Sequence, residues 1–396
     1  MKLAIVSPFP PSKGTLNEYA YHLVKNFGPK DQIEKIIIIT DKLPEGQKYL
    51  SEPEMGEVIF EPVWEFNSLT STANIVKTIK KHQPDIVLYN IQFLSFGDKK
   101  VPATIGLFSP VMSKLNGITS VVILHNIIET VDFEEAGITN NPVMKGIYNI
   151  TGNILTRTIL GSNLVTLTIP KYVKIIREKY NADNVALIPH GTFEVPPRPD
   201  FNMSSDNLNV MTFGKFGTYK KVESLIEAVD LIRKRTNKSI KITIAGTDNP
   251  NVKGYLEGVA NTYSHIENLH FTGYVEEEDV PTIFGDSTVT VFPYTSTTGS
   301  SGVLHQAGSY GNAVALPLLG DLKELVEEEG YEGAYFEPDN VESMAEAIQK
   351  LIEDLEYREY IAKKNYAAAA SLPMSEIADW YLSHFERLLE AKIQRT

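Results

Sequence analysis

The chain has 396 residues, 42% of them hydrophobic and 22% charged, which is ordinary for a globular protein and long enough for two domains. It contains no cysteine, so disulfides, thiolate metal sites and thiol nucleophiles are excluded. Its formal net charge of −13 argues against general binding of nucleic acid. No apolar run is long enough to span a membrane, and the sequence predicts a cytoplasmic protein without a transmembrane segment.

The first half alternates short apolar segments with amphipathic ones. Continuous apolar runs are typical of strands that are buried on both faces of a parallel sheet. Such runs predict strands at residues 2–7, 34–40, 85–90, 119–125, 164–169 and 184–189. A helix is expected after the first strand, and Thr15 with Glu18 predicts a capping box at its start. The alternation predicts an α/β domain with a parallel sheet.

A proline-rich segment, "GTFEVPPRPDFNMSSD" (191–206), separates the two halves. After it the alternation restarts, with strands predicted at 208–214, 240–246, 268–273, 287–294 and 312–318 and a helix at 219–235. The last helix has an apolar side, which predicts that it docks back on the first domain. The predicted parts are therefore a domain at 1–195, a linker at 196–207, a domain at 208–375 and a C-terminal helix at 376–396.

Charge is divided unevenly between the two predicted domains. Residues 1–195 hold 19 basic and 19 acidic side chains, whereas the remainder holds 18 and 31. The excess acid is interpreted as a solvated surface. It makes any basic cluster in the second domain more informative.

The loops after the first strand of each domain indicate which ligand they could take. The first loop lacks the G-x-G-x-x-G pattern of dinucleotide sites, and no G-x-x-x-x-G-K-[ST] phosphate loop occurs. Gly14 could let a phosphate or a sugar approach a helix N-terminus, or it could serve only the turn. In the second domain Lys215, Lys220 and Lys221 follow a strand, as a polyphosphate would need. A solvated loop explains Lys221 equally well.

A small and polar turn precedes a helix within "YTSTTGSSGVLHQAGSYG" (294–311). In Gly299, Ser300, Ser301 and Gly302 the small side chains would expose successive backbone N–H groups, and the helix N-terminus would add partial positive charge. Together with the lysines, these donors could stabilise the negative charge that grows on a departing diphosphate. A plain strand-to-helix turn is the alternative.

The order of these segments resembles the retaining glycosyltransferases of family 4, which have the GT-B fold of two Rossmann-like domains facing a cleft. The second half carries the likeness in "FGKFGTYKKVESLIEA", "ITIAGTDNP", "NLHFTGYVEEEDVPTIF" and "VTVFPY", and the first half in "IVSPFPPSKGTLNEYAYHLV", "VVILHN" and "VALIPHGTF". The resemblance implies transfer of a sugar from a nucleotide-diphosphate sugar, with retention of configuration. A catalytically impaired binding or scaffold subunit and a nucleotide-sugar epimerase are the alternatives.

The resemblance also implies roles for individual residues. Lys215 and Lys220 correspond to the basic pair that holds the donor diphosphate. Lys220 is also expected to be catalytic, together with His125, which corresponds to a histidine that lies against the donor sugar. The segment 273–275 corresponds to the contact with the nucleotide base. The further donor-binding residues are Gly14, Gly273, Tyr274, Val275, Thr298, Gly299, Ser300, Ser301, Gly302, Gln306 and Glu324. No metal ligand and no protein-bound cofactor are expected, although Mg²⁺ could accompany the nucleotide sugar.

The sequence departs from the family where the family has two glutamates with seven residues between them. Thr298 and Gln306 occupy these positions. Gln306 can still bond a ribose diol, but Thr298 cannot replace the charge of a carboxylate. Glu324 matches a glutamate that follows a glycine pair, of which only Gly320 is present. This departure keeps the scaffold alternative open.

The sequence leaves the donor base and the acceptor open. UDP-, GDP- and ADP-sugars all fit the expected site, and the acceptor could be a glycan, a protein, a lipid or a small molecule. The first domain would bind the acceptor, around residues 10–17 and 91–116. The segment "KYVKIIREK" (171–179) could give peripheral contact with a membrane, although a solvated helix explains it better.

Overall fold

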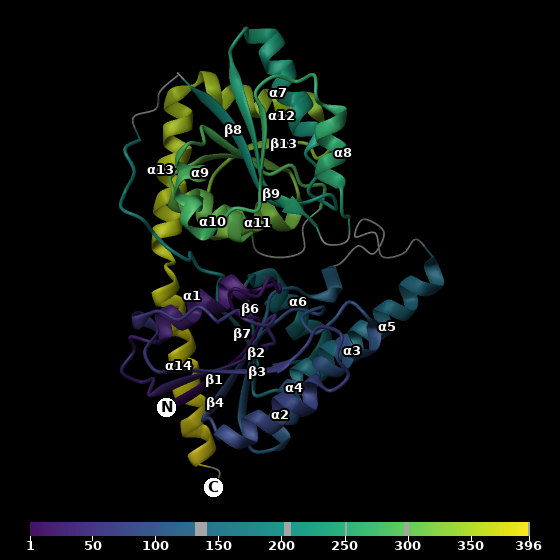
Figure 1. Cartoon of the computed structure of the whole chain (residues 1–396), viewed down its shortest axis with the longest axis vertical. Helices are drawn as coiled ribbons and strands as arrows, with labels where there is room; N and C mark the ends of the chain where they lie inside the picture. The colour runs from purple at the N-terminus through teal and green to yellow at the C-terminus, as the bar shows by residue number, and fades with distance from the viewer. Residues whose placement is uncertain (131–140, 202–206, 250–251, 297–300, 395–396) are drawn as a thin grey trace. The chain divides into compact units, whose positions relative to one another are not determined.

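The fold was obtained as a computed structural model that describes residues 1–130, 141–201, 207–249, 252–296 and 301–394. The chain divides into two compact units (Figure 1). Unit 1 contains the described residues up to His190 together with those from Met374 onward, and unit 2 contains the described residues from Gly191 to Pro373. In each unit helices cover both faces of a parallel sheet, so the predicted α/β class with two parallel sheets is confirmed.

The sheet of unit 1 contains seven strands in the described residues, all parallel, in the order β3-β2-β1-β4-β5-β6-β7. They are β1 (Lys2–Val6), β2 (Lys35–Asp41), β3 (Val58–Trp64), β4 (Ile86–Ile91), β5 (Thr119–Leu124), β6 (Leu164–Leu167) and β7 (Val185–Leu187). The helices are α1 (Asn17–Phe27), α2 (Ser71–His82), α3 (Lys100–Gly106), α4 (Ser109–Leu115), α5 (Pro142–Leu160), α6 (Pro170–Tyr180) and α14 (Met374–Ile393). Two short 3-10 turns are η1 (Pro53–Met55) and η2 (Ile128–Thr130). Strands β4 and β5 are buried along their whole length, as their continuous apolar runs predict.

Strand β3 lies outside the predicted strands because Pro62 interrupts its apolar run. Proline cannot donate a hydrogen bond to a sheet, so its presence argues against a central strand. Strand β3 lies at the edge of the sheet, beside β2. An edge strand tolerates the missing N–H group, because one of its sides has no neighbouring strand to pair with.

The sheet of unit 2 contains six parallel strands in the described residues, in the order β10-β9-β8-β11-β12-β13. They are β8 (Leu208–Phe216), β9 (Ile240–Asp248), β10 (Leu269–Gly273), β11 (Val289–Val291), β12 (Ala313–Pro317) and β13 (Ala334–Phe336). The helices are α7 (Glu223–Thr236), α8 (Tyr255–Thr262), α9 (Val280–Gly285), α10 (Gly302–Ser309), α11 (Gly320–Glu328), α12 (Val341–Glu353) and α13 (Leu355–Ser371), with a 3-10 turn η3 (Glu277–Asp279). Strand β13 was not predicted because its three residues stand between Gly333 and Glu337 without a longer apolar run, whereas the equally short β7 and β11 lie within such runs.

The C-terminal helix α14 belongs to unit 1, as its apolar side predicts. Tyr381 and Phe385 pack against Phe27 of α1, with ring centroids 6.4 and 6.0 Å away. The Tyr381 hydroxyl also shares a hydrogen bond of 3.0 Å with Thr166 of β6. The last helix therefore completes the core of the first unit. None of the helices in the described ranges is long and apolar enough to cross a membrane.

Part of the proline-rich segment packs on unit 2. The hydroxyl of Tyr366, on α13, donates to the carbonyl of Pro196 at 3.0 Å. The same ring packs edge-on against the buried Phe201, with centroids 6.1 Å apart. A Cβ at Gly311 would lie 2.7 Å from Pro199. The described residues of this segment are therefore a fixed part of the surface of unit 2.

Each sheet changes its direction of winding at one point. In unit 1 this point lies between β1 and β4, and in unit 2 it lies between β8 and β11. The loops that leave the carboxyl ends of the two flanking strands turn to opposite faces, which opens a crevice for a ligand. The loops at residues 7–16 and 217–222 leave β1 and β8 at these points.

Candidate functional site

Two glycines near the carboxyl edge of the sheet in unit 2 leave the backbone there without side chains. Gly214 on β8 and Gly246 on β9 are paired, with φ of 141° and 133°, which glycine adopts without strain. A Cβ on Gly246 would overlap the Gly214 carbonyl oxygen, and a Cβ on Gly214 would lie 2.9 Å from Lys220 Nζ. These two positions near the strand ends therefore present backbone alone, and the Lys220 ammonium lies close to the backbone of Gly214. Gly246 lies in "ITIAG", but no sequence pattern assigned it a role.

Lys220 lies in a turn and not in a helix. The helix predicted at 219–235 is α7, which begins only at Glu223. The Gly217 N–H donates to the Lys220 carbonyl at 2.9 Å and closes a turn before the helix. The predicted start is wrong because these residues pair with a distant segment of the chain, which helical periodicity cannot show.

That distant segment follows β11 and contains Tyr294. Lys220 and Tyr294 form an antiparallel bridge, and the Lys220 Nζ lies 4.6 Å from the centroid of the Tyr294 ring. Lys221 N–H donates to the Pro293 carbonyl at 3.1 Å. These contacts therefore join the loops on the two sides of the point where the winding changes. They also hold Lys220 near the carboxyl ends of β8 and β9.

The other predicted donor contacts lie on neighbouring strand ends. Lys215 is exposed near the end of β8. Gly273 ends β10 with φ of 71° and pairs with Gly246. Tyr274 is exposed, and Val275 packs against the core. The structure therefore brings Lys215 and residues 273–275 to the same edge of the sheet as Lys220.

Helix α10 begins at the end of the small polar turn. Thr298, Gly299 and Ser300 lie outside the described residues. Ser301 is the N-cap with extended backbone, and Gly302 is the first helical residue. The Ser301 side chain makes no hydrogen bond to the helix backbone. The first N–H groups of a helix have no partner inside it and carry partial positive charge, so this end of α10 can receive an anion.

Tyr294 connects the lysine turn to the start of α10. Burial raises the pKa of its phenol well above the usual range, and Ser301 beside the hydroxyl offsets part of that rise. Gln306 is half-buried one turn after the helix start. Lys220 and the N-terminus of α10 are therefore gathered around Tyr294. Sequence reasoning missed this residue, whose only signal was its place at the end of an apolar run.

The inner face of α10 carries a buried polar cluster. His305 Nδ1 shares a hydrogen bond of 2.9 Å with the Tyr331 hydroxyl, and its Nε2 lies 3.4 Å from the Glu329 carboxyl. Burial raises the pKa of Glu329 to about 8. A Cβ at Gly308 would lie 2.7 Å from the Tyr331 ring and 2.8 Å from the Asn365 carbonyl oxygen. The cluster and this close approach fix the position of α10.

Glu324 lies on α11, which begins at Gly320 after β12. Its side chain is exposed. Helices α10 and α11 both start at the carboxyl edge of the sheet, so Glu324 and Gln306 are on elements that leave the same edge. Within the ranges that the structure describes, no three histidine, aspartate or glutamate side chains are grouped to hold a metal ion.

His125 follows β5 of unit 1 and is held by Asn90 of β4. Its Nε2 lies 2.6 Å from Asn90 Oδ1, while Asn90 Nδ2 donates to the Leu16 carbonyl (3.1 Å) and to Ser7 Oγ (3.0 Å). Because a carbonyl can only accept, the Asn90 oxygen must accept from His125. The proton is therefore on Nε2, which leaves Nδ1 as an acceptor. Burial, with the nearby His190, lowers the pKa of His125 to about 3, so the imidazole is neutral at physiological pH.

The loop after β1 has a strained conformation that Asn90 helps to hold. Leu16 has φ of 72°, a left-handed conformation that is rare for a bulky residue. It is the N-cap of α1, and no side chain caps this helix. The capping box predicted from Thr15 and Glu18 is therefore wrong, because the hydrogen bond from Asn90 fixes the helix start one residue later.

Gly14 is packed closely in the same loop. Its N–H donates to Ser12 Oγ at 3.1 Å, and a Cβ there would lie 2.7 Å from the Pro8 side chain. Ser12 in turn donates to the Asp41 carboxylate, 2.5 Å away at the end of β2. Packing against Pro8 explains the glycine, and the donor contact assigned to Gly14 stays a prediction.

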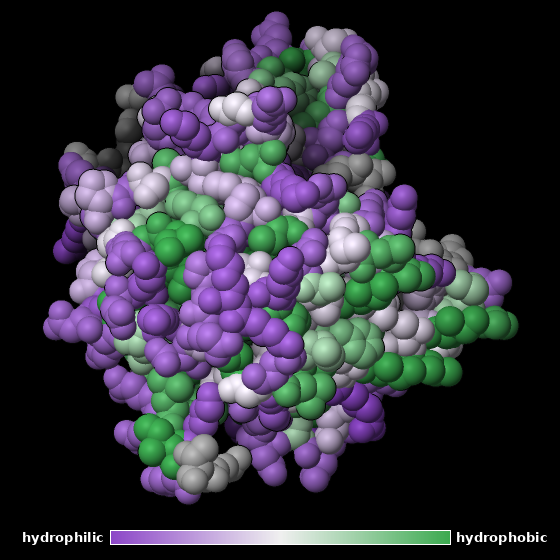
Figure 2. All heavy atoms as spheres, turned by 60° about the horizontal axis from the view of Figure 1, so that its bottom comes forward, coloured by the Kyte–Doolittle hydropathy of each residue, from purple (hydrophilic) through white to green (hydrophobic). Residues whose placement is uncertain are grey.

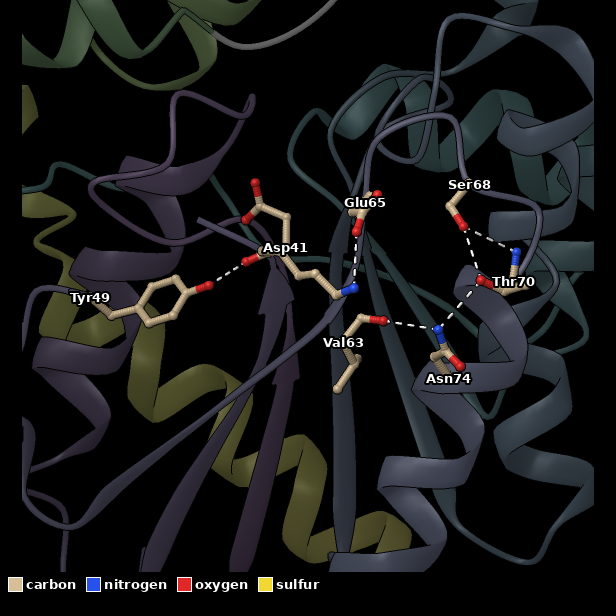
Figure 3. A network of polar contacts seen from close by, with 8 residues as sticks. Asp41, Tyr49, Val63, Glu65, Ser68, Thr70 and Asn74 are labelled. Atoms are coloured by element: carbon tan, nitrogen blue, oxygen red, sulfur yellow. Dashed lines mark hydrogen bonds and ion pairs between the residues drawn. The ribbon is translucent and has the colours of Figure 1, made fainter. Parts of the chain in front are cut away.

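A polar network lies at the carboxyl ends of β2 and β3 (Figure 3). The Tyr49 hydroxyl donates to the Asp41 carbonyl, and Lys42 Nζ lies 2.9 Å from the Glu65 carboxylate. The Asp41 carboxylate also receives the bond from Ser12. Asp41 therefore ties the loop after β1 to the segment after β2, at the edge where open sheets bind ligands.

The sequence of unit 2 matches a known family. Residues 207–354 match the family model described as glycosyl transferases group 1. An uncharacterized glycosyltransferase of Methanocaldococcus jannaschii is 27% identical over 172 residues, which is 42% of this chain and 42% of that relative. The match therefore spans less than half of the relative's length.

Solved structures with a similar fold cover nearly the whole chain. A sucrose-phosphate synthase of Thermosynechococcus elongatus has a TM-score of 0.76 at 16% identity, with 99% of this chain and 100% of that chain covered. HepE of Anabaena, in a structure with UDP-glucose, has a TM-score of 0.70 at 16% identity, with 98% and 100% covered. At such low identity the likeness shows the fold. Retention of configuration stays a prediction. The resemblance is confirmed at two levels: residues 207–354 carry the sequence pattern of the group 1 glycosyl transferases, and the chain has the predicted GT-B fold.

Proposed function

We propose that this chain is a retaining glycosyltransferase whose unit 2 binds a nucleotide-diphosphate sugar. The observation that carries the proposal is the place of Lys220, whose ammonium lies against the bare backbone of Gly214 and over Tyr294. Helix α10 begins beside Tyr294 and adds backbone donors. A diphosphate is stabilised by a cation and by the N–H groups of a helix N-terminus, and it can approach backbone that carries no side chain. The match of residues 207–354 to glycosyl transferases supports a sugar nucleotide as the ligand.

In this reaction the bond between the anomeric carbon and the diphosphate oxygen breaks, and its electron pair goes to the diphosphate. The acceptor oxygen forms the new bond on the same face of the sugar, and its proton passes to the departing diphosphate. Lys220 and the N–H groups at the start of α10 stabilise the charge that develops. Because they are in place beforehand, they favour the transition state over the bound donor. Mg²⁺, where it takes part, enters with the nucleotide sugar.

His125 is assigned to the donor sugar as an orienting residue. Asn90 fixes its Nδ1 as an acceptor, which suits a sugar hydroxyl. Its pKa of about 3, set by burial, keeps the imidazole neutral, so it does not act as an acid at neutral pH. A hydrogen bond from a sugar hydroxyl to Nδ1 would hold the donor without a proton transfer.

Replacing Lys220 tests the donor site. Lys220→Met keeps the apolar stem over Tyr294 and removes the charge. It should weaken binding of the matching nucleotide sugar by about 10- to 100-fold, because charge-assisted contacts contribute roughly 1.5–3 kcal/mol. The measurement is the rise in Tm with UDP-, GDP- and ADP-sugars. UDP-sugars come first, because HepE was solved with UDP-glucose.

Lys221→Met is the matched control, since Lys221 is exposed and adjacent in sequence. It should leave the shift in Tm unchanged. If none of these nucleotide sugars stabilises the unaltered protein, the proposed function is wrong. If both variants lose the shift equally, Lys220 has no special role.

A binding or scaffold subunit is the second candidate. It is favoured by Thr298 and Gln306 at positions where the resembling family has glutamates. Single-turnover experiments with bound donor separate the two candidates, because only the enzyme hydrolyses or transfers the sugar. An altered sugar in the absence of acceptor would instead indicate an epimerase.

A further inference from the structure

The N-terminal half of α5 exposes an apolar stripe. Val143, Ile147, Ile150 and Ile154 recur at the spacing of one helix face, and 71%, 48%, 64% and 55% of their surface is exposed. None of residues 142–151 is buried. The buried residues of this helix occupy the opposite side of its second half: Gly152, Leu155, Thr156 and Ile159. Helix α5 therefore has one apolar side inside unit 1 and another that is exposed.

The stripe continues onto α3 and α4. Lys100 Nζ on α3 lies 4.8 Å from the centroid of the Tyr148 ring on α5, so the two helices are neighbours. Exposed hydrophobic side chains on and between α3 and α4 are Val101, Phe108, Met112 and Leu115. Figure 2 shows apolar side chains gathered at the right, over the part of unit 1 where Figure 1 places these three helices. The apolar patch is defined as these four residues together with the stripe on α5.

The patch lies in the basic part of an acidic chain. Helices α3, α4 and α5 carry the basic residues Lys100, Lys114, Lys145 and Arg157 and no acidic residue, whereas the whole chain holds 37 basic and 50 acidic residues. Four acidic residues, Glu129, Asp132, Glu134 and Glu135, lie in the sequence between α4 and α5. Lys99 and Lys100 flank the start of α3, and Lys145 and Arg157 lie on α5. Exposed aliphatic side chains among cations complement anionic headgroups above acyl chains.

Helix α6, which contains the segment 171–179, offers no such surface. Its apolar residues Tyr172, Val173 and Ile176 are buried in unit 1. Its exposed side is charged, with Lys174 and Arg177 among its members. The solvated interpretation of this segment is therefore the better one, and α5 is the element suited to contact lipid.

We propose that unit 1 docks on an anionic lipid bilayer through the apolar patch, with α5 lying in the interface. A helix with one apolar side and flanking cations inserts that side at the boundary of headgroups and acyl chains. The acidic remainder of the chain is repelled by the same membrane, so this face is the one that approaches it. The docking does not depend on the proposed donor site, and it can be tested without a sugar nucleotide.

Flotation with lipid vesicles tests the docking on the full chain. The protein should bind vesicles that contain roughly one third phosphatidylglycerol in phosphatidylcholine, and bind phosphatidylcholine alone much less. Ile147→Gln with Ile150→Gln should lower the partition by roughly tenfold or more, because it removes apolar area from the stripe. Lys99→Gln with Lys100→Gln should lower binding to the anionic vesicles and make the remainder less sensitive to salt.

The matched control is Leu355→Gln with Ile393→Gln, which removes two exposed apolar side chains outside the patch. It should bind vesicles like the unaltered protein. The proposal is overturned if the unaltered protein stays unbound, or if the control loses as much binding as the stripe variant. It is also overturned if the stripe variant only converts a dimer to a monomer and vesicles bind neither form, because the patch would then join two copies.

The absence of cysteine allows a direct measurement of insertion. Ile150→Cys, labelled with a fluorophore that responds to polarity, should shift to shorter wavelength with anionic vesicles. The same label at Leu355→Cys should not shift. Equal shifts at both positions would mean adsorption without a defined face and would contradict docking through α5.

Discussion

Asn90 determines two features of unit 1 with one side chain. Its oxygen accepts from His125 and fixes the imidazole tautomer, and its amide group donates to the Leu16 carbonyl and holds a strained loop. A left-handed leucine costs about 1–3 kcal/mol, which the surrounding contacts must offset. A sequence pattern shows Asn90 only as the end of a strand, so its role depends on which loop the fold places against it.

Two substitutions separate the functions of Asn90. Asn90→Leu removes the acceptor, so His125 should populate the tautomer with the proton on Nδ1. Asn90→Asp keeps an acceptor for Nε2 but cannot donate to Leu16, so the tautomer should stay and the pKa of His125 should rise beside the new charge. Nitrogen-15 NMR of the labelled histidines reports both. An unchanged tautomer in Asn90→Leu would contradict the assignment.

Glu329 makes the stability of the fold depend on pH. Its pKa is about 8 in the folded chain, against 4.5 ordinarily, because it is buried beside Glu328. The folded chain therefore keeps a proton that the unfolded chain releases between these values. The free energy of unfolding falls as pH rises from about 4.5 to about 8, by at most about 1.4 kcal/mol per pH unit.

Glu329→Gln should abolish this dependence, since the amide stays neutral. The variant should match the unaltered protein near pH 5 and be more stable near pH 8, by on the order of 2 kcal/mol or more. Tm measured at the two pH values checks this. Glu327→Gln, on the exposed side of α11, is the control and should change neither difference. Equal Tm differences at both pH values for Glu329→Gln would show that its carboxyl is ionised in the fold.

At the scale of the element, the position of α10 depends on Gly308, which packs closely against Tyr331 and Asn365. Gly308→Ala would place a Cβ 2.7 Å from the Tyr331 ring and 2.8 Å from the Asn365 carbonyl oxygen. The helix should be displaced, with a loss of about 1–3 kcal/mol of stability. Thermal or urea unfolding measures the loss, and donor binding should weaken with it.

Gly258→Ala on α8 is the same substitution with open space around it. Alanine is the better helix former, so this variant should gain about 0.5–1 kcal/mol. The opposite signs of the two changes separate packing from helix propensity. A gain in both variants would show that α10 has room to adapt.

The boundaries of the helices and strands show where the local sequence pattern was sufficient to predict the structure. The apolar runs predicted most strands of both sheets, because a strand buried on both faces needs such a run. The starts of α1 and α7 were misplaced, since the bond from Asn90 and the bridge between Lys220 and Tyr294 join residues far apart in sequence. Edge strand β3 was missed because proline is allowed there.

At the scale of the whole molecule, the two units share one design. In each unit, contacts join the loop after the first strand to a strand or segment on the other side of the point where the winding changes. Unit 1 uses Asn90 and Leu16, and unit 2 uses Lys220 and Tyr294. Both sets of contacts lie at the carboxyl edge of their sheet, where an open sheet binds its ligand. The same chain also crosses back at its end, so that α14 completes the core of unit 1.

The sequence by itself determined the two parallel-sheet units, the return of the last helix and the family resemblance, because these depend on apolar periodicity and on the order of short motifs. It also indicated Lys215, Lys220 and the start of α10 as an anion site. Only the tertiary structure decided that Lys220 lies beside the backbone of Gly214, that His125 is a neutral acceptor and that α5 leaves an apolar stripe exposed. The features of Lys220 and His125 depend on contacts between segments that are distant in the sequence. The exposed stripe depends on the lack of such contacts along one face of α5. Burial and exposure are properties of the folded chain alone.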